Sequence, residues 1–186
     1  MGELPEWAEV SPTRLEHTRR VAHLMHDWAV HQGLDAAGCD RWRATGLLHD
    51  ALRDAPARHL QPWAGPGFRG LPDSFLHGPA TAARLQAEGL DDAEVLDAIR
   101  YHTLGSPDLG RLGRILIAAD FLEPGRHQNA EWRGRLRERG RTDLDGVIRE
   151  VIRAKIQRCM DADLPVRPEM FGLWNRLVID ESSEGR

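Results

Sequence analysis

The amino-acid sequence predicts an all-α fold, and three observations support this expectation. Apolar residues recur at intervals of three and four along the chain, as they do on one face of a helix. No segment shows the strict alternation that is typical of a half-buried strand. Residues that favour helix ends, such as Ser, Asp, Pro and Gly, separate the periodic segments. We expect one domain over residues 1–186, with a core of roughly 11–125 and C-terminal helices at 131–178 packed on it.

The first two expected helices lead up to an adjacent histidine and aspartate. The first covers about 12–31, behind the N-cap Ser11 and with proline at its first position. The second covers about 36–52 and carries His49 and Asp50 near its C-terminal end. Adjacent side chains on a helix point about 100° apart, so both would reach one metal only from opposite flanks of a groove.

The rest of the chain alternates between loop and helix signals. Residues 56–72 are rich in Gly and Pro, so we expect a loop there. The segment 126–141 is rich in arginine with interleaved glutamate, which is typical of a solvated helix face. Further helices are expected at 79–88, 92–102, 109–122, 131–139, 144–160 and 168–178.

Composition and charge exclude several classes of protein. Hydrophobic residues make up 41% and charged residues 29%, as in an ordinary globular protein. The formal net charge of −4 argues against non-specific nucleic-acid binding. No apolar stretch is long enough to span a membrane, and residues 1–10 are acidic where a signal peptide is basic and apolar, so a cytoplasmic location is expected. Cys39 and Cys159 form no disulfide framework or thiolate metal motif.

Asp120 follows the run 115–119, which is apolar on every side, so a buried helix is predicted there. A carboxylate in such a helix is costly unless it is paired, hydrogen-bonded or bound to a metal. Considered by itself, Asp120 could equally be buried in an ion pair with an arginine. Because His49 and Asp50 offer further metal ligands, a metal site is the favoured interpretation. His17 lies on or beside the apolar stripe of the first helix.

His102 and His77 are two further candidates. His102 shares a helix face with Val95 and Ile99 and so points inward, although a lone inward histidine is usually a core residue. His77 precedes a helix N-terminus, where unpaired N–H groups favour an anion such as phosphate, although a simple loop histidine would look the same.

Two motifs are interpreted as decoys. His26 and Asp27 form a second His-Asp pair, but on the face of the first helix that is expected to be exposed to solvent. The glycines at 65, 67 and 70 match a dinucleotide-binding pattern, yet no strand precedes them.

The chain resembles the HD-domain phosphohydrolases, and within them the bacterial symmetrical bis(5′-nucleosyl)-tetraphosphatases. The resemblance rests on five segments and extends nearly end to end. They are Arg14-Leu15-Glu16-His17-Thr18, Gly46-Leu47-Leu48-His49-Asp50, Leu76-His77-Gly78-Pro79, Ala98-Ile99-Arg100-Tyr101-His102-Thr103 and Ala119-Asp120-Phe121-Leu122-Glu123-Pro124-Gly125-Arg126. It implies a single HD-domain helical bundle with a buried metal site, which would hydrolyse diadenosine tetraphosphate to two ADP.

The resemblance also implies roles for individual residues. One divalent transition metal would be bound, iron in this family, although ligand chemistry leaves manganese, cobalt, nickel and zinc as alternatives. The implied metal ligands are His17, His49, Asp50 and Asp120. The implied substrate contacts are Arg14, Asp50, Arg53, His77, His102, Thr103 and Arg126. The implied catalytic residues are His77, His102 and Asp50, and one of the two histidines would protonate the leaving ADP.

Three hypotheses follow. The first is symmetrical cleavage of dinucleoside tetraphosphates by metal-activated water. The second keeps this site but acts on another nucleotide, with one metal or with a second at His77 and His102. The third is a nucleotide-sensing or partner-binding protein whose contact surface is segment 126–141 with an exposed Trp132.

Apolar residues of the C-terminal helices would close the core or form a homodimer surface, and closing the core is the favoured interpretation.

Overall fold

The computed structural model describes residues 3–184, and within them all regular structure is helical. The all-α prediction is therefore confirmed. The α-helices are α1 (Pro12–His31), α2 (Ala36–Leu48), α3 (Ala57–Ala64), α4 (His77–Ala87), α5 (Ala93–Tyr101), α6 (Arg111–Leu122), α7 (Ala130–Arg139), α8 (Leu144–Asp161) and α9 (Pro168–Glu184). Two short 3-10 helices are η1 (Pro66–Phe68) and η2 (Asp73–Phe75).

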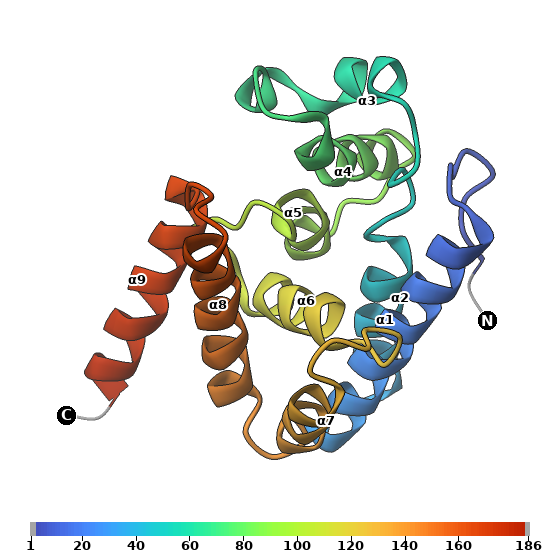
Figure 1. The fold of residues 1–186 in the computed structure, drawn as a ribbon. Helices are drawn as coiled ribbons and strands as arrows, with labels where there is room; N and C mark the ends of the chain where they lie inside the picture. The colour runs from blue at the N-terminus through green and yellow to red at the C-terminus, as the bar shows by residue number, and fades with distance from the viewer. Residues whose placement is uncertain (1–2, 185–186) are drawn as a thin grey trace.

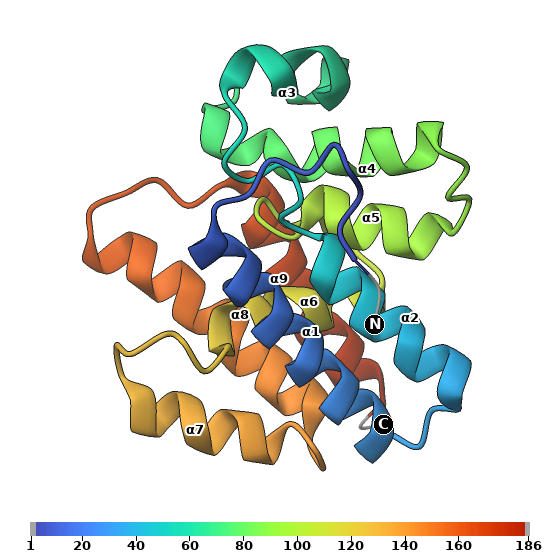
Figure 2. The same cartoon turned by 90° about the vertical axis from the view of Figure 1, so that its right-hand side faces the viewer.

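Helix α6 is the centre of the arrangement. Figure 1 shows α4, α5 and α6 stacked one above another, with the pair α1 and α2 on one side and α8 and α9 on the other. In the view of Figure 2, α1 passes in front of α6. Residues 115–119 of α6 are fully buried because they are apolar on every side, and each large side chain among them stabilises the fold by roughly 1.5–3 kcal/mol.

Helix α3 was not expected, because residues 56–72 were predicted to be a loop. Leu60 and Ala64 lie four residues apart and therefore on one helix face, which packs against Leu52, Leu76 and Ala80. Because Pro62 lies inside the helix and glycines follow it, the composition indicated a loop, and this short apolar pattern was not recognised as a helix.

Two helix boundaries near the candidate residues also differ from the prediction. Helix α2 ends at Leu48, so His49 and Asp50 lie in the turns that follow rather than within the helix. Helix α4 begins at His77, two residues before the proline that was expected to start it.

The arginine-rich segment is only partly a solvated face. Arg133 is 5% exposed, and its guanidinium donates hydrogen bonds to the carbonyl oxygens of Phe121 and Gln128. Trp132 is half-buried and donates from its indole Nε1 to Glu150. The expectation of an exposed Trp132 is therefore wrong, because α7 uses this residue to pack on its neighbours.

No helix among residues 3–184 combines the length and the apolarity that a membrane span requires.

Candidate metal centre

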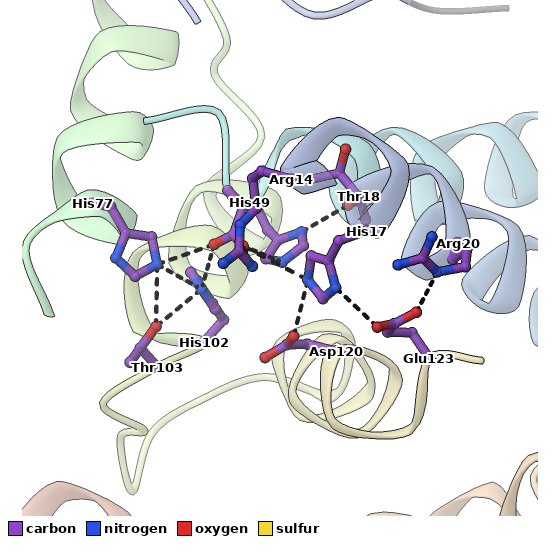
Figure 3. A network of polar contacts seen from close by, with 12 residues as sticks. Arg14, His17, Thr18, Arg20, His49, His77, His102, Thr103, Asp120 and Glu123 are labelled. Atoms are coloured by element: carbon purple, nitrogen blue, oxygen red, sulfur yellow. Dashed lines mark hydrogen bonds and ion pairs between the residues drawn. The ribbon is translucent and has the colours of Figure 1, made fainter. Parts of the chain in front are cut away.

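The fold brings together six residues from five separate parts of the chain, which we call the cluster. Figure 3 shows its histidines and Asp120 pointing toward one another. They lie on α1, in the turn after α2, at the start of α4, in the turn after α5 and on α6. The members are His17, His49, Asp50, His77, His102 and Asp120. All are buried except Asp120, whose side chain is 19% exposed.

Asp50 is the central carboxylate of the cluster, and its Oδ2 faces the α1 side. This oxygen lies 2.9 Å from a guanidinium nitrogen of Arg14. It also lies 3.5 Å from Nε2 of His49 and 3.7 Å from Nε2 of His17. The same Nε2 of His17 lies 3.1 Å from Oδ1 of Asp120.

The second oxygen of Asp50 faces the α4 and α5 side. Oδ1 lies 3.1 Å from Nε2 of His77 and 3.5 Å from Nε2 of His102. The two imidazole Nε2 atoms are 3.1 Å apart, and the Thr103 hydroxyl lies 3.0 Å from that of His102. One carboxylate thus connects two groups of imidazoles.

Local backbone geometry orients two of these rings in the same way. Nδ1 of His49 lies 2.7 Å from the carbonyl oxygen of Gly46, and Nδ1 of His102 lies 2.8 Å from that of Ile99. A carbonyl accepts only from a protonated nitrogen, so in the neutral rings Nδ1 carries the hydrogen and Nε2 presents its lone pair to the cluster.

His17 is oriented by a carboxylate instead. Its Nδ1 lies 3.3 Å from Oε1 of Glu123, a buried residue whose other oxygen accepts from Arg20 at 2.5 Å and from the backbone N–H of Gly125 at 2.7 Å. Burial acts to lower the pKa of His17, but Asp120 and Glu123 outweigh burial and raise the pKa to about 9. This position therefore favours a cation, which is either a proton on His17 or a metal that replaces it.

The charges of the other members suit a metal as well. Burial lowers the pKa of His49 to about 4, so this ring is neutral at pH 7 and its Nε2 is available as a ligand. Burial acts to raise the pKa of Asp50, but His49, His102 and His77 outweigh it and hold the pKa well below its usual value. His17 and His49 likewise overcome burial and lower the pKa of Asp120. Both carboxyl groups are ionised at neutral pH.

The donor atoms fit a divalent transition metal. Nε2 of His49 is buried and makes no hydrogen bond, although burying an unpaired polar atom is costly, and Nε2 of His17 is buried with only the ion pair to Asp120 and Asp50. Ligand atoms of His17, His49 and Asp50 lie within 4.8 Å of one another, and so do those of Asp50, His77 and His102. Imidazole and carboxylate ligands with outer-shell hydrogen bonds are typical of such metal sites.

Two arginines implied as substrate contacts, Arg126 and Arg53, differ in whether their side chains reach the cluster. Arg126 reaches the cluster, since its guanidinium lies 2.9 Å from Oδ1 of Asp120. Arg53 is half-buried, and its backbone N–H donates to the carbonyl oxygen of Asp50 at 2.9 Å, but among the described residues no hydrogen bond or ion pair joins its guanidinium to the cluster side chains.

Sequence reasoning gave no role to Glu123 and Arg20. The signal was present for Glu123, which stands three residues after Asp120 at the end of an apolar helix and is therefore on a neighbouring face. Arg20 lies three residues after His17 on α1, and its guanidinium pairs with Glu123 at the C-terminal end of α6.

We expect Glu123→Gln to weaken metal binding by about 10- to 100-fold, because an amide orients His17 less strongly and does not raise its basicity. Metal titration followed by mass spectrometry measures this change. Glu16→Gln is a matched control, since Glu16 is also on α1 and pairs with Arg19 at the surface. Equal metal affinity in Glu123→Gln and Glu16→Gln would show that Glu123 does not support the site.

Comparisons with known proteins agree with this geometry. The family model described as HD domain matches residues 14–125. A protein of Halalkalibacterium halodurans named symmetrical bis(5′-nucleosyl)-tetraphosphatase is 32% identical over 112 residues, which cover 59% of this chain and 58% of the relative. A protein of the same name from Bacillus subtilis is 35% identical over 103 residues, which cover 55% and 54%. The aligned part of the chain thus spans little more than half the length of these relatives.

A solved structure supports the fold over a longer range. The chain titled "predicted HD superfamily hydrolase involved in NAD metabolism" from Clostridium acetobutylicum superposes with a TM-score of 0.75 and 24% identity, covering 92% of both chains. The family model spans more than half of the sequence and includes every residue of the cluster. This chain therefore belongs to the HD domain family.

Proposed function

We propose that this protein is a metal-dependent hydrolase that cleaves diadenosine tetraphosphate into two molecules of ADP. The observation that carries the proposal is the position of Asp50, with the candidate metal ligands His17 and His49 on one oxygen and the His77 and His102 pair on the other. Such a cluster suits activation of water beside a bound phosphate chain. The names of the relatives from two bacilli support this substrate.

The metal would be held by His17, His49, Asp50 and Asp120, with iron, manganese, cobalt, nickel and zinc all compatible with these ligands. When bound, it would supply a water of lowered pKa and would polarise a phosphoryl oxygen. Glu123 fixes the ring of His17, and the Gly46 carbonyl fixes the ring of His49. These contacts support the proposed role of both rings as ligands.

Phosphate binding would fall to cations that now pair with cluster carboxylates. The Arg14 side chain is 27% exposed and the Arg126 side chain 42% exposed, so both guanidinium groups reach solvent and can turn to a phosphate. Guanidinium groups bind phosphate through paired hydrogen bonds. Thr103 offers a hydroxyl beside His102, and Arg53 keeps a positive charge near His77, where it acts to lower the pKa of that ring.

The hydrolysis forms one bond and breaks one. The oxygen of water bonds to one of the two central phosphorus atoms, and the bond from that phosphorus to the bridging oxygen breaks. The bridging oxygen leaves with its electron pair on the other ADP. His77 is suited to hold a proton for this oxygen, because its Nε2 lies between Asp50 and His102 and faces the cluster.

Product analysis tests the proposal. The metal-loaded protein is expected to convert diadenosine tetraphosphate to ADP alone, which chromatography of the nucleotides measures. Formation of ATP and AMP would contradict symmetrical cleavage. A second candidate function is hydrolysis of another nucleotide with two metals, which is favoured by the second ligand group of Asp50, His77 and His102. Faster turnover of mononucleotides or cyclic nucleotides in a parallel panel would support that function instead.

A further inference from the structure

A cavity of about 610 Å³ opens beside the cluster. Asp120 and Thr103 line its inner end, so it is continuous with the candidate metal centre. Its outer part is formed by α8, by the connection from α8 to α9 and by η2. Ligand cavities in proteins typically have volumes of about 300–1,000 Å³, and a nucleotide fits within this range.

The cavity is strongly cationic. Among the described residues that line it, Asp120 is the only acidic one, and it pairs with Arg126. The lining cations are Arg126, Arg133, Lys155, Arg158 and Arg167. An excess of positive charge in a concave surface attracts an anion and concentrates it there.

Lys155 is the most informative of these cations. It lies on α8 and is half-buried, yet no hydrogen bond or ion pair joins its ammonium group to the described residues. Burial lowers the pKa of Lys155, and the charge of Asp120 offsets this only in part. Arg158 also lines the cavity but is exposed to solvent. Keeping the partly buried Lys155 charged without a close partner is costly to the free protein, and an anionic ligand would compensate this cost.

The outer wall of the cavity adds apolar surface. Phe75, Ile156 and Met170 line it, and the Arg167 guanidinium lies 5.8 Å from the centre of the Phe75 ring. Aromatic and guanidinium planes are common stacking partners of nucleobases. The cations lie near the cluster and the apolar surface lies further out. A nucleotide bound with its phosphates toward the cluster would therefore place its base against the apolar surface.

The symmetry of the substrate explains why a second binding region is needed. A dinucleoside tetraphosphate has two identical halves, but Arg14 and His77 lie on one side of the cluster and do not line the cavity. We propose that the cavity between α6 and α8 binds the second nucleoside diphosphate half, with Lys155 as a phosphate ligand. This inference rests on the proposed function for the identity of the ligand.

Calorimetry with ADP and the metal-loaded protein tests the binding directly. We expect the wild type to bind two ADP per chain. Lys155→Met should weaken one of these sites about tenfold, which corresponds to the loss of one charged contact. Lys155→Arg should restore most of the affinity. Arg153→Met is the matched control, because Arg153 is exposed on the same helix and lies outside the cavity.

Kinetics with diadenosine tetraphosphate give the second readout. Lys155→Met should raise KM about tenfold with a smaller effect on kcat, and Arg153→Met should change neither. If Lys155→Met fails to fold, Arg158→Met at the exposed end of the cavity replaces it with the same expectation. Wild-type affinity for ADP at both sites and wild-type KM in the cavity variants would overturn the inference while leaving the proposed function intact. Weakened ADP binding without any hydrolysis in the wild type would overturn the proposed function alone.

Discussion

Asp50→Asn is expected to lower the hydrolysis of diadenosine tetraphosphate by about a hundredfold to a thousandfold, which is the scale of removing one well-placed electrostatic group from an active site. The reason is the central position of Asp50, whose two oxygens face Arg14 and four imidazoles. An amide carries no charge and presents only one oxygen, so it would bind a metal poorly and leave the facing cations without a counter-charge.

Two measurements check this expectation. The first is the initial rate of ADP formation at saturating substrate. The second is the rise in melting temperature when manganese or iron is added, since a metal that binds only the folded protein stabilises it. Wild-type protein should show this rise, and Asp50→Asn should show little or none.

Asp27→Asn is the control, because Asp27 belongs to the second His-Asp pair of the chain. Asp27 is half-buried rather than exposed as predicted, and its carboxylate accepts from Arg141 at 2.9 Å. Its substitution should leave metal binding and hydrolysis unchanged. If Asp27→Asn and Asp50→Asn lost activity to a similar extent, the cluster would not be the active site.

Local sequence patterns were sufficient to predict the elements whose signals are contained in one segment. The N-cap Ser11 defined the start of α1, and its hydroxyl accepts from the backbone N–H of Arg14. The apolar run 115–119 predicted a buried helix, and Asp120 was recognised as unusual because it ends that run. These inferences need no knowledge of distant residues.

Features that depend on distant contacts could not be predicted in this way. Helix α3 is stabilised by packing on α4 and on the turn after α2, which a loop-like composition conceals. His49 keeps helical backbone angles after the end of α2, so the contacts of His49 and Asp50 depend on the elements packed around them, which the sequence does not reveal. Lys155 on α8 and Asp120 on α6 line the same cavity, although they are far apart in sequence.

The same limit applies to Glu123. Its burial depends on Arg20 and on the backbone N–H of Gly125, and only the tertiary structure brings α1 and the end of α6 together. Outer-shell residues of a metal site are difficult to identify from sequence because their partners are ligands rather than the metal.

Gly46→Val is expected to lower the free energy of unfolding by about 3 kcal/mol or more, at the upper end of the cost of overpacking. Gly46 lies where α2 crosses α1, and a Cβ atom there would stand 2.9 Å from the Cα of Ala22 and 3.0 Å from the sulfur of Met25. The first of these atoms belongs to the backbone, so relief requires the two helices to move apart. Urea unfolding measures the loss.

The matched control for Gly46→Val is Gly134→Val. Gly134 is also helical, but a Cβ atom there would meet only the guanidinium of Arg137 at 3.7 Å. Valine and glycine have similar helix propensities, so this change should alter stability by less than about 0.5 kcal/mol. Similar losses in the two variants would show that the close approach of α1 and α2 does not stabilise the fold.

The substitution at Gly46 should also weaken metal binding, because α1 and the turn after α2 supply His17 and His49. The carbonyl oxygen of Gly46 itself accepts from Nδ1 of His49, so a displaced helix end would turn this ring away from the cluster. We therefore expect any Gly46→Val protein that still folds to bind metal more weakly than the wild type at the same temperature. Wild-type metal affinity in that variant would mean that helix spacing and ligand geometry are independent. The absence of a side chain at Gly46 would then be required for packing alone.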